Sequence, residues 1–284
     1  MITGKTQNLG VMGWPIAHSL SPLMQQAAIA AAGADYSYIA LPVRPERLAQ
    51  AVAGLRAVEF RGWNVTIPHK QAIMPLLDGI DPDARAIGAV NTVVNEDGRL
   101  QGYNTDVTGF LLPLQERGVK LAGQEALVLG AGGAARAVLY GLMKSGVQTV
   151  HVGVRNPAKA QALADSLAAY GKSRVYDWHS EAFQAVLSKV SLLVNTTPLG
   201  MAPKVEETPP VEWGLVRPET FVYDIIYTPA ETRFLAEARK HGCPTQNGER
   251  MLAGQGAEAF RLWSGKEADI SVMCEALRKA LETV

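Results

Sequence analysis

The stretch Ala126-Leu-Val-Leu-Gly-Ala-Gly-Gly-Ala-Ala135 decides the fold of the second half of this 284-residue chain. An apolar run typical of a buried strand leads directly into a turn of the pattern GxGxx(G/A), and an apolar helix should follow to Ser145. Gly130 allows the tight turn, Gly132 lets the backbone approach a pyrophosphate, and Ala135 keeps the helix close to the strand. The helix N-terminus presents free N–H groups to the phosphates. The stretch therefore predicts a dinucleotide site, although the same turn can also join a strand to a helix and bind nothing.

The end of the next predicted strand indicates which dinucleotide would bind. NAD sites usually place an Asp or Glu about 20 residues beyond the glycines, where it binds the ribose 2′-hydroxyl. Here the strand 149–154 is followed by Arg155-Asn-Pro-Ala-Lys159, without an acidic residue. A guanidinium binds a 2′-phosphate that a carboxylate would repel, so Arg155 favours NADP. Arg155 and Lys159 could also be ordinary exposed charges of a loop.

Strand-like runs alternate with helical runs along the whole chain, which is typical of an α/β protein with mostly parallel strands. A hairpin about Asp97-Gly98 interrupts this rhythm. We predict an N-terminal α/β substrate-binding domain with a mixed, mostly parallel sheet (residues 1–106 plus 248–284) and a Rossmann-type dinucleotide-binding domain (residues 107–247), with the active site in the cleft between them. The expected strands are 9–13, 36–41, 62–66, 91–95, 99–103, 126–130, 149–154, 191–195 and 221–226, and the expected helices are 22–32, 45–55, 106–117, 133–145, 251–263 and 269–281.

Composition excludes several classes of protein. Lys and Arg total 27, as do Asp and Glu, so the chain has no net charge to attract nucleic acid or an anionic membrane. Two cysteines and five histidines without ligand spacing argue against a disulfide framework and a metal site. Residues 1–8 lack the apolar run of a secretory signal, and Arg136 and several glycines interrupt the apolar stretch 126–143. We therefore expect a cytoplasmic protein.

Two charged residues of the predicted first domain stand where a fold alone does not require them. In Gly62-Trp-Asn-Val-Thr-Ile-Pro-His-Lys70, the proline predicts a helix start, which would put Lys70 in a first turn, where the helix dipole disfavours a cation. Asp106 ends the motif Gly102-Tyr-Asn-Thr-Asp106, and Asn91 opens the predicted hairpin before it. If Lys70 and Asp106 converge at the strand ends, they would form an acid–base pair. Lys70 could instead extend into solvent, and Asp106 could be only an N-cap; His69 is interpreted as a surface or packing residue.

Two hydroxyls lie close together in Gly13-Trp-Pro-Ile-Ala-His-Ser-Leu-Ser-Pro22. Ser21 before Pro22 suits the N-cap of a helix whose first residue is proline. Ser19 has no such structural role in the predicted fold. Together the two serines, beside a helix N-terminus, suit an anion or a polyol.

In sequence order, motifs spread over essentially the whole chain resemble those of the shikimate dehydrogenases, including the related quinate/shikimate enzymes: HSLSP, GWNVTIPHK, IGAVNTVV, GYNTD, GAGGAARA, VNTTPLGM, YDIIYTPAET and NGERMLAGQGAEAF. The resemblance implies an oxidoreductase that acts on a CH–OH group. It would reversibly reduce 3-dehydroshikimate to shikimate with NADPH, on the way to chorismate and the aromatic amino acids. The implied partners are small molecules, with no nucleic acid and no membrane, and the implied assembly is a monomer or a homodimer.

The resemblance also implies roles for individual residues. Lys70 and Asp106 would be the catalytic pair that moves a proton to or from the 3-oxygen of the substrate, with Lys70 as the principal acid–base group. The implied substrate-binding residues are Ser19 and Ser21 for the carboxylate, Thr66, Asn91 and Gln255 for the ring hydroxyls and carboxylate, Asp106 for the reacting hydroxyl, and Tyr227 near them. The implied cofactor-binding residues are Gly130, Ala131, Gly132, Gly133, Ala134, Arg155, Asn195, Thr196, Thr197, Gly248 and Met251, and no metal is implied.

The chain departs from the family pattern in three places. Gln25-Gln26 stands where the family often has His-Asn, Val154-Arg155-Asn156 stands for its Asn-Arg-Thr, and Glu249-Arg250 replaces an apolar residue followed by glycine. These departures leave quinate tolerance and cofactor affinity open, so an enzyme that prefers quinate or uses NAD is the first alternative. A non-catalytic dinucleotide-binding regulator is the second, and retention of both Lys70 and Asp106 argues against it.

Overall fold

The computed structural model describes residues 2–282, which form two compact units. The first unit runs up to Gly109 and resumes at Leu252, and the second spans Phe110–Met251. The predicted domain boundaries, 106/107 and 247/248, lie a few residues before these divisions. Met1, Thr283 and Val284, which the prediction placed in the first domain, lie outside the described residues.

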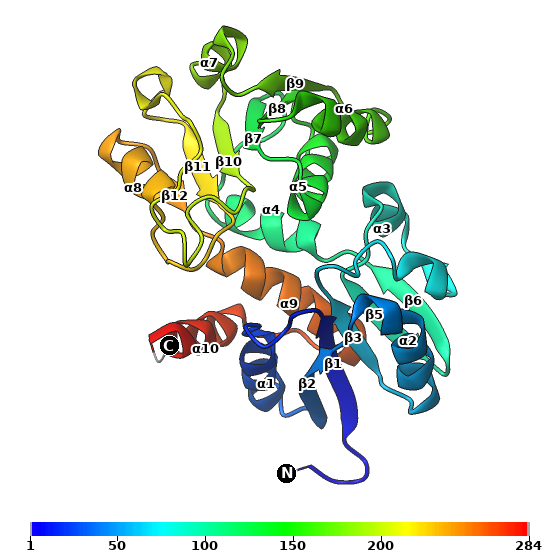
Figure 1. Cartoon of the computed structure of the whole chain (residues 1–284). Helices are drawn as coiled ribbons and strands as arrows, with labels where there is room; N and C mark the ends of the chain where they lie inside the picture. The colour runs from blue at the N-terminus through cyan, green and yellow to red at the C-terminus, as the bar shows by residue number, and fades with distance from the viewer. Residues whose placement is uncertain (1, 283–284) are drawn as a thin grey trace. The chain divides into compact units, whose positions relative to one another are not determined.

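The first unit is built on a mixed sheet with the strand order β2-β1-β3-β5-β6-β4 (Figure 1). Strand β5 runs antiparallel to β3 and β6, and the other neighbouring strands are parallel, which confirms the predicted mixed and mostly parallel sheet. The strands are β1 (Gln7–Gly13), β2 (Tyr36–Pro42), β3 (Gly62–Val65), β4 (Gly79–Ile80), β5 (Thr92–Glu96) and β6 (Arg99–Tyr103).

The predicted hairpin is present between β5 and β6. Glu96 pairs with Arg99, which leaves Asp97 and Gly98 as a two-residue turn. Their φ angles are 51° and 85°, so both lie in the left-handed region that a type I′ turn requires. The Asn95 side chain accepts the Gly98 N–H at 2.9 Å and closes the turn.

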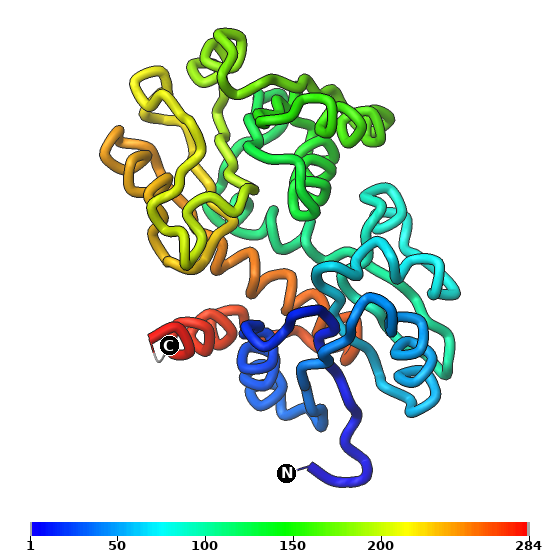
Figure 2. Tube along the Cα trace, in the orientation of Figure 1, coloured from blue at the N-terminus to red at the C-terminus, as the bar shows by residue number. Residues whose placement is uncertain are grey.

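Successive side chains of a strand point to opposite faces of the sheet, and here both faces are buried. On one face Leu9 and Val11 pack with Phe260 and Trp263, and on the other Met12 packs with Leu48 and Val52 of α2, among others. In Figure 2 the red C-terminal helix lies beside the blue helix α1, and the two are in contact. The helices of this unit include α1 (Ser21–Ala31), α2 (Leu48–Ala57), α3 (Pro82–Ile87), most of α9 (Glu249–Ser264) and α10 (Ile270–Glu282).

Helix α1 begins differently from the prediction. Its N-cap is Leu20, whose side chain makes no capping hydrogen bond, and Ser21 is its first residue, because Leu20 already has helical angles (φ −87°, ψ −3°). The prediction that Ser21 is the N-cap is therefore wrong. Ser19 does have a structural role, because its Oγ accepts the Ser21 N–H at 3.3 Å. Further along α1, Gln25 is fully buried and donates from Nε2 to the Gly256 carbonyl at 2.9 Å, so this departure from the family pattern ties α1 to α9.

The second unit is a Rossmann-type fold, as predicted. Its sheet has the order β12-β11-β10-β7-β8-β9 with all neighbours parallel, and the order reverses between β7 and β10. In such sheets ligands bind beyond the carboxyl ends of the strands at this reversal. The strands are β7 (Glu125–Leu129), β8 (Thr149–Val154), β9 (Ser173–Asp177), β10 (Leu192–Asn195), β11 (Phe221–Asp224) and β12 (Thr245–Gln246).

Helices cover this parallel sheet, and strands β7, β8, β10 and β11 are almost entirely buried. The helices are α4 (Asp106–Glu116), which crosses the division at Gly109, α5 (Gly133–Lys144), α6 (Pro157–Ser166), α7 (Glu181–Leu187) and α8 (Arg233–Lys240). Helix α5 packs on β7 and β8, α6 on β8 and β9, and α8 on β11 and β12. The packing fixes the strand ends, where the loops of the candidate cofactor site begin.

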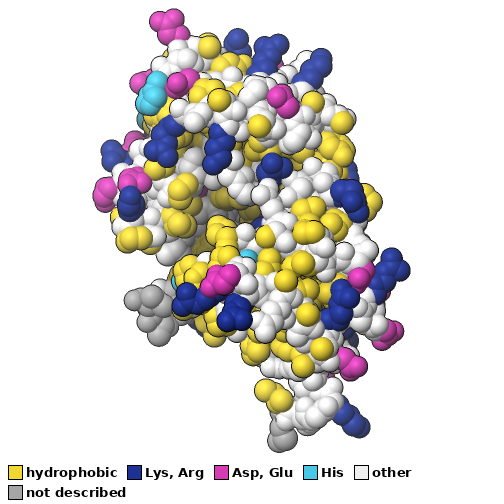
Figure 3. Space-filling view, turned by 45° about the vertical axis from the view of Figure 1, so that its right-hand side comes forward, with side chains coloured by type: hydrophobic (Ala, Val, Ile, Leu, Met, Phe, Trp, Pro, Cys, Tyr) yellow, Lys and Arg dark blue, Asp and Glu magenta, His cyan; other side chains and the backbone are white. Residues whose placement is uncertain are grey.

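The surface carries charges of both signs. On the face shown in Figure 3, Lys and Arg side chains lie interspersed with Asp and Glu rather than gathered in one patch. Within residues 2–282, no helix combines the length and apolarity that crossing a bilayer would need.

Candidate active site

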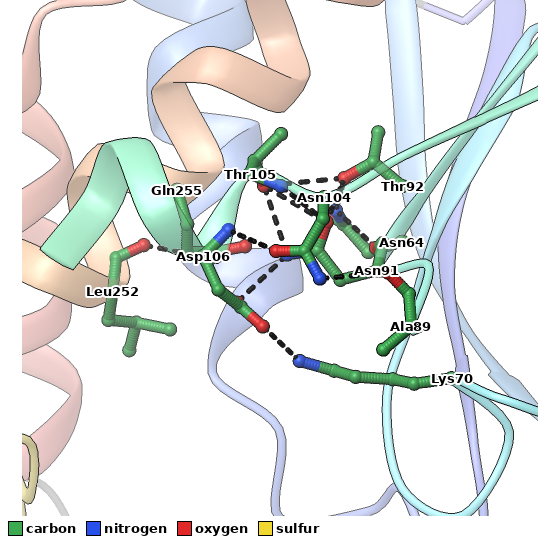
Figure 4. Close-up of polar contacts among 10 residues, drawn as sticks. All are labelled: Asn64, Lys70, Ala89, Asn91, Thr92, Asn104, Thr105, Asp106, Leu252 and Gln255. Carbon is green, nitrogen blue, oxygen red and sulfur yellow. Dashed lines mark hydrogen bonds and ion pairs between the residues drawn. The ribbon is translucent and has the colours of Figure 1, made fainter. Parts of the chain in front are cut away.

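Lys70 and Asp106 form an ion pair in the first unit. Lys70 Nζ lies 2.5 Å from Asp106 Oδ2, and the two side chains are 23% and 12% exposed. Figure 4 shows the lysine reaching the carboxylate from its own loop. A charged pair that is largely buried but still reachable from solvent can meet a ligand and exchange a proton with it.

Asp106 is held by the segment that leads from β6 into α4. Asn104 Oδ1 accepts the Asp106 N–H at 3.1 Å, and Asn104 Nδ2 donates to the Ala89 carbonyl at 2.9 Å. Asp106 is the first residue of α4, where a negative charge is favoured by the helix dipole. Its Oδ1 accepts from Asn91 Nδ2 at 2.9 Å, while Oδ2 faces Lys70. The carboxylate thus has more than a capping role.

The loop that carries Lys70 is not the helix that Pro68 predicts. Residues 68–73 are mainly turns, and the Lys70 carbonyl accepts the Val90 N–H at 2.8 Å from a distant segment instead of an amide four residues on. The predicted opposition between Lys70 and a helix dipole therefore loses its basis. His69 is buried, with Nε2 2.7 Å from the Val43 carbonyl, so it is a packing residue.

The buried side-chain amide of Asn91 supports the ion pair through its hydrogen bond to Asp106. Its Nδ2 donates to Asp106 and, at 3.0 Å, to Thr105 Oγ1, while its Oδ1 accepts the Thr105 N–H at 2.8 Å and the Thr92 hydroxyl at 3.0 Å. Every polar atom of this amide is engaged, which fixes its orientation.

Asn64 extends the same network into the sheet. It donates from Nδ2 to the Asn91 carbonyl at 3.2 Å and to Thr92 Oγ1 at 3.0 Å, and it accepts from Tyr38 Oη at 2.6 Å. Burial raises the pKa of Tyr38, which keeps its hydroxyl a donor. Sequence reasoning did not assign Asn64, Thr92 or Thr105 to the site. The detectable signal was a polar residue inside the buried strand β3, since such residues need specific partners.

The other predicted substrate-binding residues have varied surroundings. Thr66 directly follows β3 and is half-buried; a Cβ at Gly13 would come 2.5 Å from its methyl carbon, so that glycine leaves room for it. Gln255 lies on α9 and donates to the Leu252 carbonyl of the same helix at 2.9 Å (Figure 4). Tyr227 belongs to the second unit, where burial raises its pKa.

The second unit contains a cavity of about 370 Å³ at the carboxyl ends of its strands. The lining residues lie at or after the ends of β7, β8 and β10: Gly130, Ala131, Gly132, Val154, Arg155, Asn156, Lys159, Thr196, Thr197, Pro198 and Leu199, together with Trp178. Gly130 has a φ of +108°, and a Cβ there would lie 2.8 Å from Thr196 Oγ1. At Gly132 a Cβ would meet nothing within 4 Å, so the backbone faces open space.

The charged side chains of this cavity are cationic. Arg155 and Lys159 line it, no Asp or Glu does so among the described residues, and the Arg155 guanidinium lies 6.0 Å from the centre of the Trp178 ring. Gly132 is the N-cap of α5, which leaves the first N–H groups of that helix near the cavity. Open backbone, a helix N-terminus and two cations fit a dinucleotide that carries an additional phosphate.

Five residues predicted to bind the cofactor do not line this cavity. Gly133 and Ala134 begin α5. Asn195 is fully buried, and its side chain supports the loop at Thr197. A Cβ at Gly248 would come 1.9 Å from the Ile225 carbonyl, so glycine is required there for packing, and Met251 is buried.

The departure at Glu249-Arg250 also has a structural partner, because Arg250 pairs with Glu116 on α4. The part of the chain that the structure describes contains no cluster of His, Cys, Asp or Glu able to hold a metal ion.

Three family models match the chain. Residues 11–93 match a shikimate dehydrogenase substrate-binding domain, 114–197 a shikimate/quinate 5-dehydrogenase, and 248–278 a shikimate 5′-dehydrogenase C-terminal domain. A relative from Moorella thermoacetica named shikimate dehydrogenase (NADP(+)) is 49% identical over 283 residues, covering 99% of this chain and 95% of the relative. The chain belongs to the shikimate dehydrogenase family.

Solved structures of this family have the same fold. Shikimate 5-dehydrogenase from Listeria monocytogenes, in complex with shikimate and NAD, matches with a TM-score of 0.93 and 38% identity, covering 97% of this chain and 98% of the other. The enzyme from Thermus thermophilus, in complex with NADP(H) and shikimate, matches with a TM-score of 0.87 and 42% identity, covering 96% and 99% of the two chains.

Proposed function

We propose that this chain is an NADP-dependent shikimate dehydrogenase that reversibly reduces 3-dehydroshikimate to shikimate. The observation that carries the proposal is the ion pair between Lys70 and Asp106, held on a buried amide in a member of this family. A pure binding protein has no need of such a pair.

Lys70 is the principal acid–base group in this proposal. Its ammonium group gives a proton to the 3-oxygen when the ketone is reduced, and the neutral amine takes it back in the reverse direction. Asp106 accepts hydrogen bonds from the lysine and from the reacting hydroxyl, while Asn91 keeps the carboxylate in place. When bound, the nicotinamide cofactor supplies or accepts the hydride.

The remaining polar residues bind the substrate. Ser19 and Ser21, at the start of α1, hold its carboxylate, and Thr66, Asn91 and Gln255 bind its ring hydroxyls and carboxylate, with Tyr227 as a further contact. A small polyhydroxylated acid needs this many partners because each unpaired polar group in a closed site costs about 1–3 kcal/mol. For the same reason the site discriminates by hydroxyl pattern, and the paired serines favour shikimate over quinate.

NADP is the proposed cofactor. Arg155 binds the 2′-phosphate, and Lys159, which lines the same cavity, adds a second cation. The backbone of Gly130, Ala131 and Gly132 lies along the pyrophosphate, with the α5 N-terminus at Gly133 and Ala134, and Thr196 and Thr197 form the opposite wall. Gly248 and Met251 remain proposed to approach the nicotinamide. NAD use is the second candidate, because the Listeria relative binds NAD with shikimate.

The proposed reaction also suggests the localisation, assembly and partners of the enzyme. We infer a cytoplasmic enzyme, monomeric or homodimeric, whose partners are its small-molecule substrate and cofactor. Its product would feed the synthesis of chorismate and the aromatic amino acids.

Initial rates of nicotinamide absorbance, with shikimate or quinate crossed against NADP or NAD, test the proposal. Fast reduction only with shikimate and NADP is the expected result. Activity with quinate or NAD would be consistent with the proposed role of the acid–base pair, but it would overturn the specificity assigned to Ser19, Ser21 and Arg155. No activity in any combination would favour a binding protein.

A further inference from the structure

Asp224, the last residue of β11, is a carboxylate that the proposed reaction does not use. It is fully buried, and both of its oxygens are engaged. Oδ1 accepts from Asn195 Nδ2 and from the Ile226 N–H, each at 3.1 Å, and Oδ2 accepts from Thr232 Oγ1 at 2.6 Å. All three donors are neutral, and burial raises the pKa of Asp224 to about 6. A group that is so costly to bury is retained only where its bonds matter.

One of these bonds leads directly to the wall of the cavity. Asn195 Oδ1 accepts the Thr197 N–H at 3.0 Å and the Thr197 hydroxyl at 2.7 Å, and the Leu199 N–H donates to Thr197 Oγ1 at 3.3 Å. Residues 196–199 line the cavity. The Asn195 side chain therefore links the carboxylate to the wall by hydrogen bonds, and its Nδ2 also donates to the Leu199 carbonyl at 3.4 Å.

The carboxylate also decides which way the Asn195 amide faces. An ionised carboxyl group only accepts hydrogen bonds, so Asn195 must present Nδ2 to Asp224 and Oδ1 to Thr197. If the amide turned over, Oδ1 would face a carboxylate oxygen and Thr197 would lose its acceptor. The charge thus selects the amide orientation that holds the loop.

The other two bonds tie Asp224 to neighbouring segments. The Ile226 carbonyl accepts the Gly248 N–H at 2.9 Å, so the loop after β11 is fixed from both sides. Thr232 is the N-cap of α8, where its hydroxyl accepts the Leu235 N–H at 3.3 Å. The bond from Oδ2 thus leads to the start of α8, whereas that from Asn195 leads to the cavity.

We propose that Asp224 is a positioning residue for cofactor binding, which holds the 196–199 wall in its binding shape by orienting Asn195. The inference rests on the proposed function, because it takes this cavity to be the NADP site. Its consequence is specific. Loss of the carboxylate weakens cofactor binding and leaves substrate affinity and saturated turnover nearly unchanged.

The test is the dissociation constant of NADPH, measured by its fluorescence on the purified full chain without substrate. Asp224→Ala is the main variant, because it removes the oxygen that accepts from Asn195; an asparagine would keep an oxygen towards Asn195 and the Ile226 N–H and turn its NH2 group towards the Thr232 hydroxyl. We expect the Kd to rise about tenfold, as for loss of one well-made hydrogen bond. The KM for shikimate and kcat at saturating NADPH should stay within about twofold of wild type, because the carboxylate is proposed to act only on the wall of the cofactor cavity.

Thr232→Val is the matched control, because it removes a bond to the same carboxylate at the oxygen that does not face Asn195. It should lower the thermal midpoint and change the NADPH Kd less than about twofold, since Oδ1 keeps its partners. If Asp224→Ala and Thr232→Val lose NADPH affinity equally, Asp224 acts only through the general stability of the fold, which overturns the proposal. Unchanged NADPH binding in Asp224→Ala also overturns it.

Asn195→Ala keeps the test valid if Asp224→Ala does not fold. It removes the side chain through which the carboxylate is proposed to hold the wall, so it must weaken NADPH binding at least as much, and normal binding would refute the proposal. Where both fold, the double variant should bind no worse than Asn195→Ala alone, as coupled residues do. A wild-type chain that binds neither NADPH nor NADH would overturn the proposed function together with this inference, whereas failure of the variants alone overturns only the inference.

Discussion

Asp106 and Asp224 are the same side chain in two different surroundings. Asp106 begins α4, keeps 12% of its side chain exposed and faces the Lys70 ammonium at 2.5 Å. Asp224 ends β11, is fully buried and accepts hydrogen bonds from Asn195, Ile226 and Thr232, all of them neutral. The cation and the exposure suit exchange with a ligand, while burial among neutral donors suits holding a shape. Surroundings, and not residue type, separate a reacting group from a positioning one.

The same contrast holds for the two regions around these residues. In the first unit side chains converge on one point, with Asn91 beneath the ion pair. In the second unit the cavity is lined by loop residues that include Gly130 and Gly132, and the buried side chains of Asn195 and Asp224 support one of these loops without lining the cavity. Substitutions in the first region should therefore change turnover, and substitutions in the second region should change cofactor affinity.

Lys70→Ala should give the largest effect and the sharpest test of this division. General acid–base groups contribute about 10²–10⁴-fold to rate, so kcat should fall by that factor. The NADPH Kd should stay within about twofold, because Lys70 does not line the cavity. Lys240→Ala, which removes an exposed lysine paired with Glu237, is the control and should leave both values unchanged. Weakened NADPH binding in Lys70→Ala would contradict this separation of turnover from cofactor affinity.

Asp106→Asn should reduce kcat by about 10²-fold, at the lower end of the range for such groups. The lysine that moves the proton remains, but it loses its charged partner and its orientation. The KM for shikimate should rise as well, since the carboxylate is proposed to bind the reacting hydroxyl. Asp78→Asn is the matched control, because Asp78 forms an exposed pair with Arg56. If both variants keep full activity, Asp106 is only the start of a helix.

Arg155→Asp should act on the other region, with an effect of about 10–100-fold on the NADPH Kd. A charged hydrogen bond to phosphate contributes about 1.5–3 kcal/mol, and the new carboxylate would repel the 2′-phosphate. NADH serves as the internal control, since it lacks that phosphate, and its Kd should be unchanged or lower. Fluorescence titration of both cofactors checks the prediction. Unchanged NADPH affinity would refute the assignment of Arg155.

Local sequence patterns predicted those parts of the molecule that local chemistry determines. Asp97-Gly98 makes its own turn because both residues tolerate positive φ, and Gly130 permits a turn that a side chain would block. Alternating strands and helices then led to the Rossmann-type sheet. The convergence of Lys70 and Asp106 was also within reach, since polar residues at strand ends meet at one edge of a sheet.

Long-range partners explain what the sequence could not show. The loop at Lys70 is not a helix because its carbonyl pairs with Val90, twenty residues away. Asn195 was interpreted as a cofactor contact, yet its partner Asp224 lies 29 residues further on and draws its amide into the interior. Asp224 itself was included in a predicted strand without a role. A strand pattern indicates burial, but not which neighbouring strand supplies the donors.

The smallest predicted effect concerns Asp224 and the pH dependence of stability. Its pKa in the folded chain, about 6, lies above the ordinary 3.8, so the folded state binds this proton more tightly than the unfolded state. The resulting stabilisation is complete below about pH 3.8 and is lost as the pH rises through about 6. Between pH 5 and 7 the wild type should lose about 1 kcal/mol more than Asp224→Asn, roughly 2 °C in Tm.

Thermal melting of wild type, Asp224→Asn and Asp78→Asn across this range checks the sign. Asp78→Asn should run parallel to the wild type, because the Leu100 N–H and the Arg56 guanidinium lower the pKa of Asp78, which places its titration below the window. If Asp224→Asn also runs parallel, the Asp224 carboxyl does not titrate in this range, and burial among neutral donors does not raise its pKa as expected.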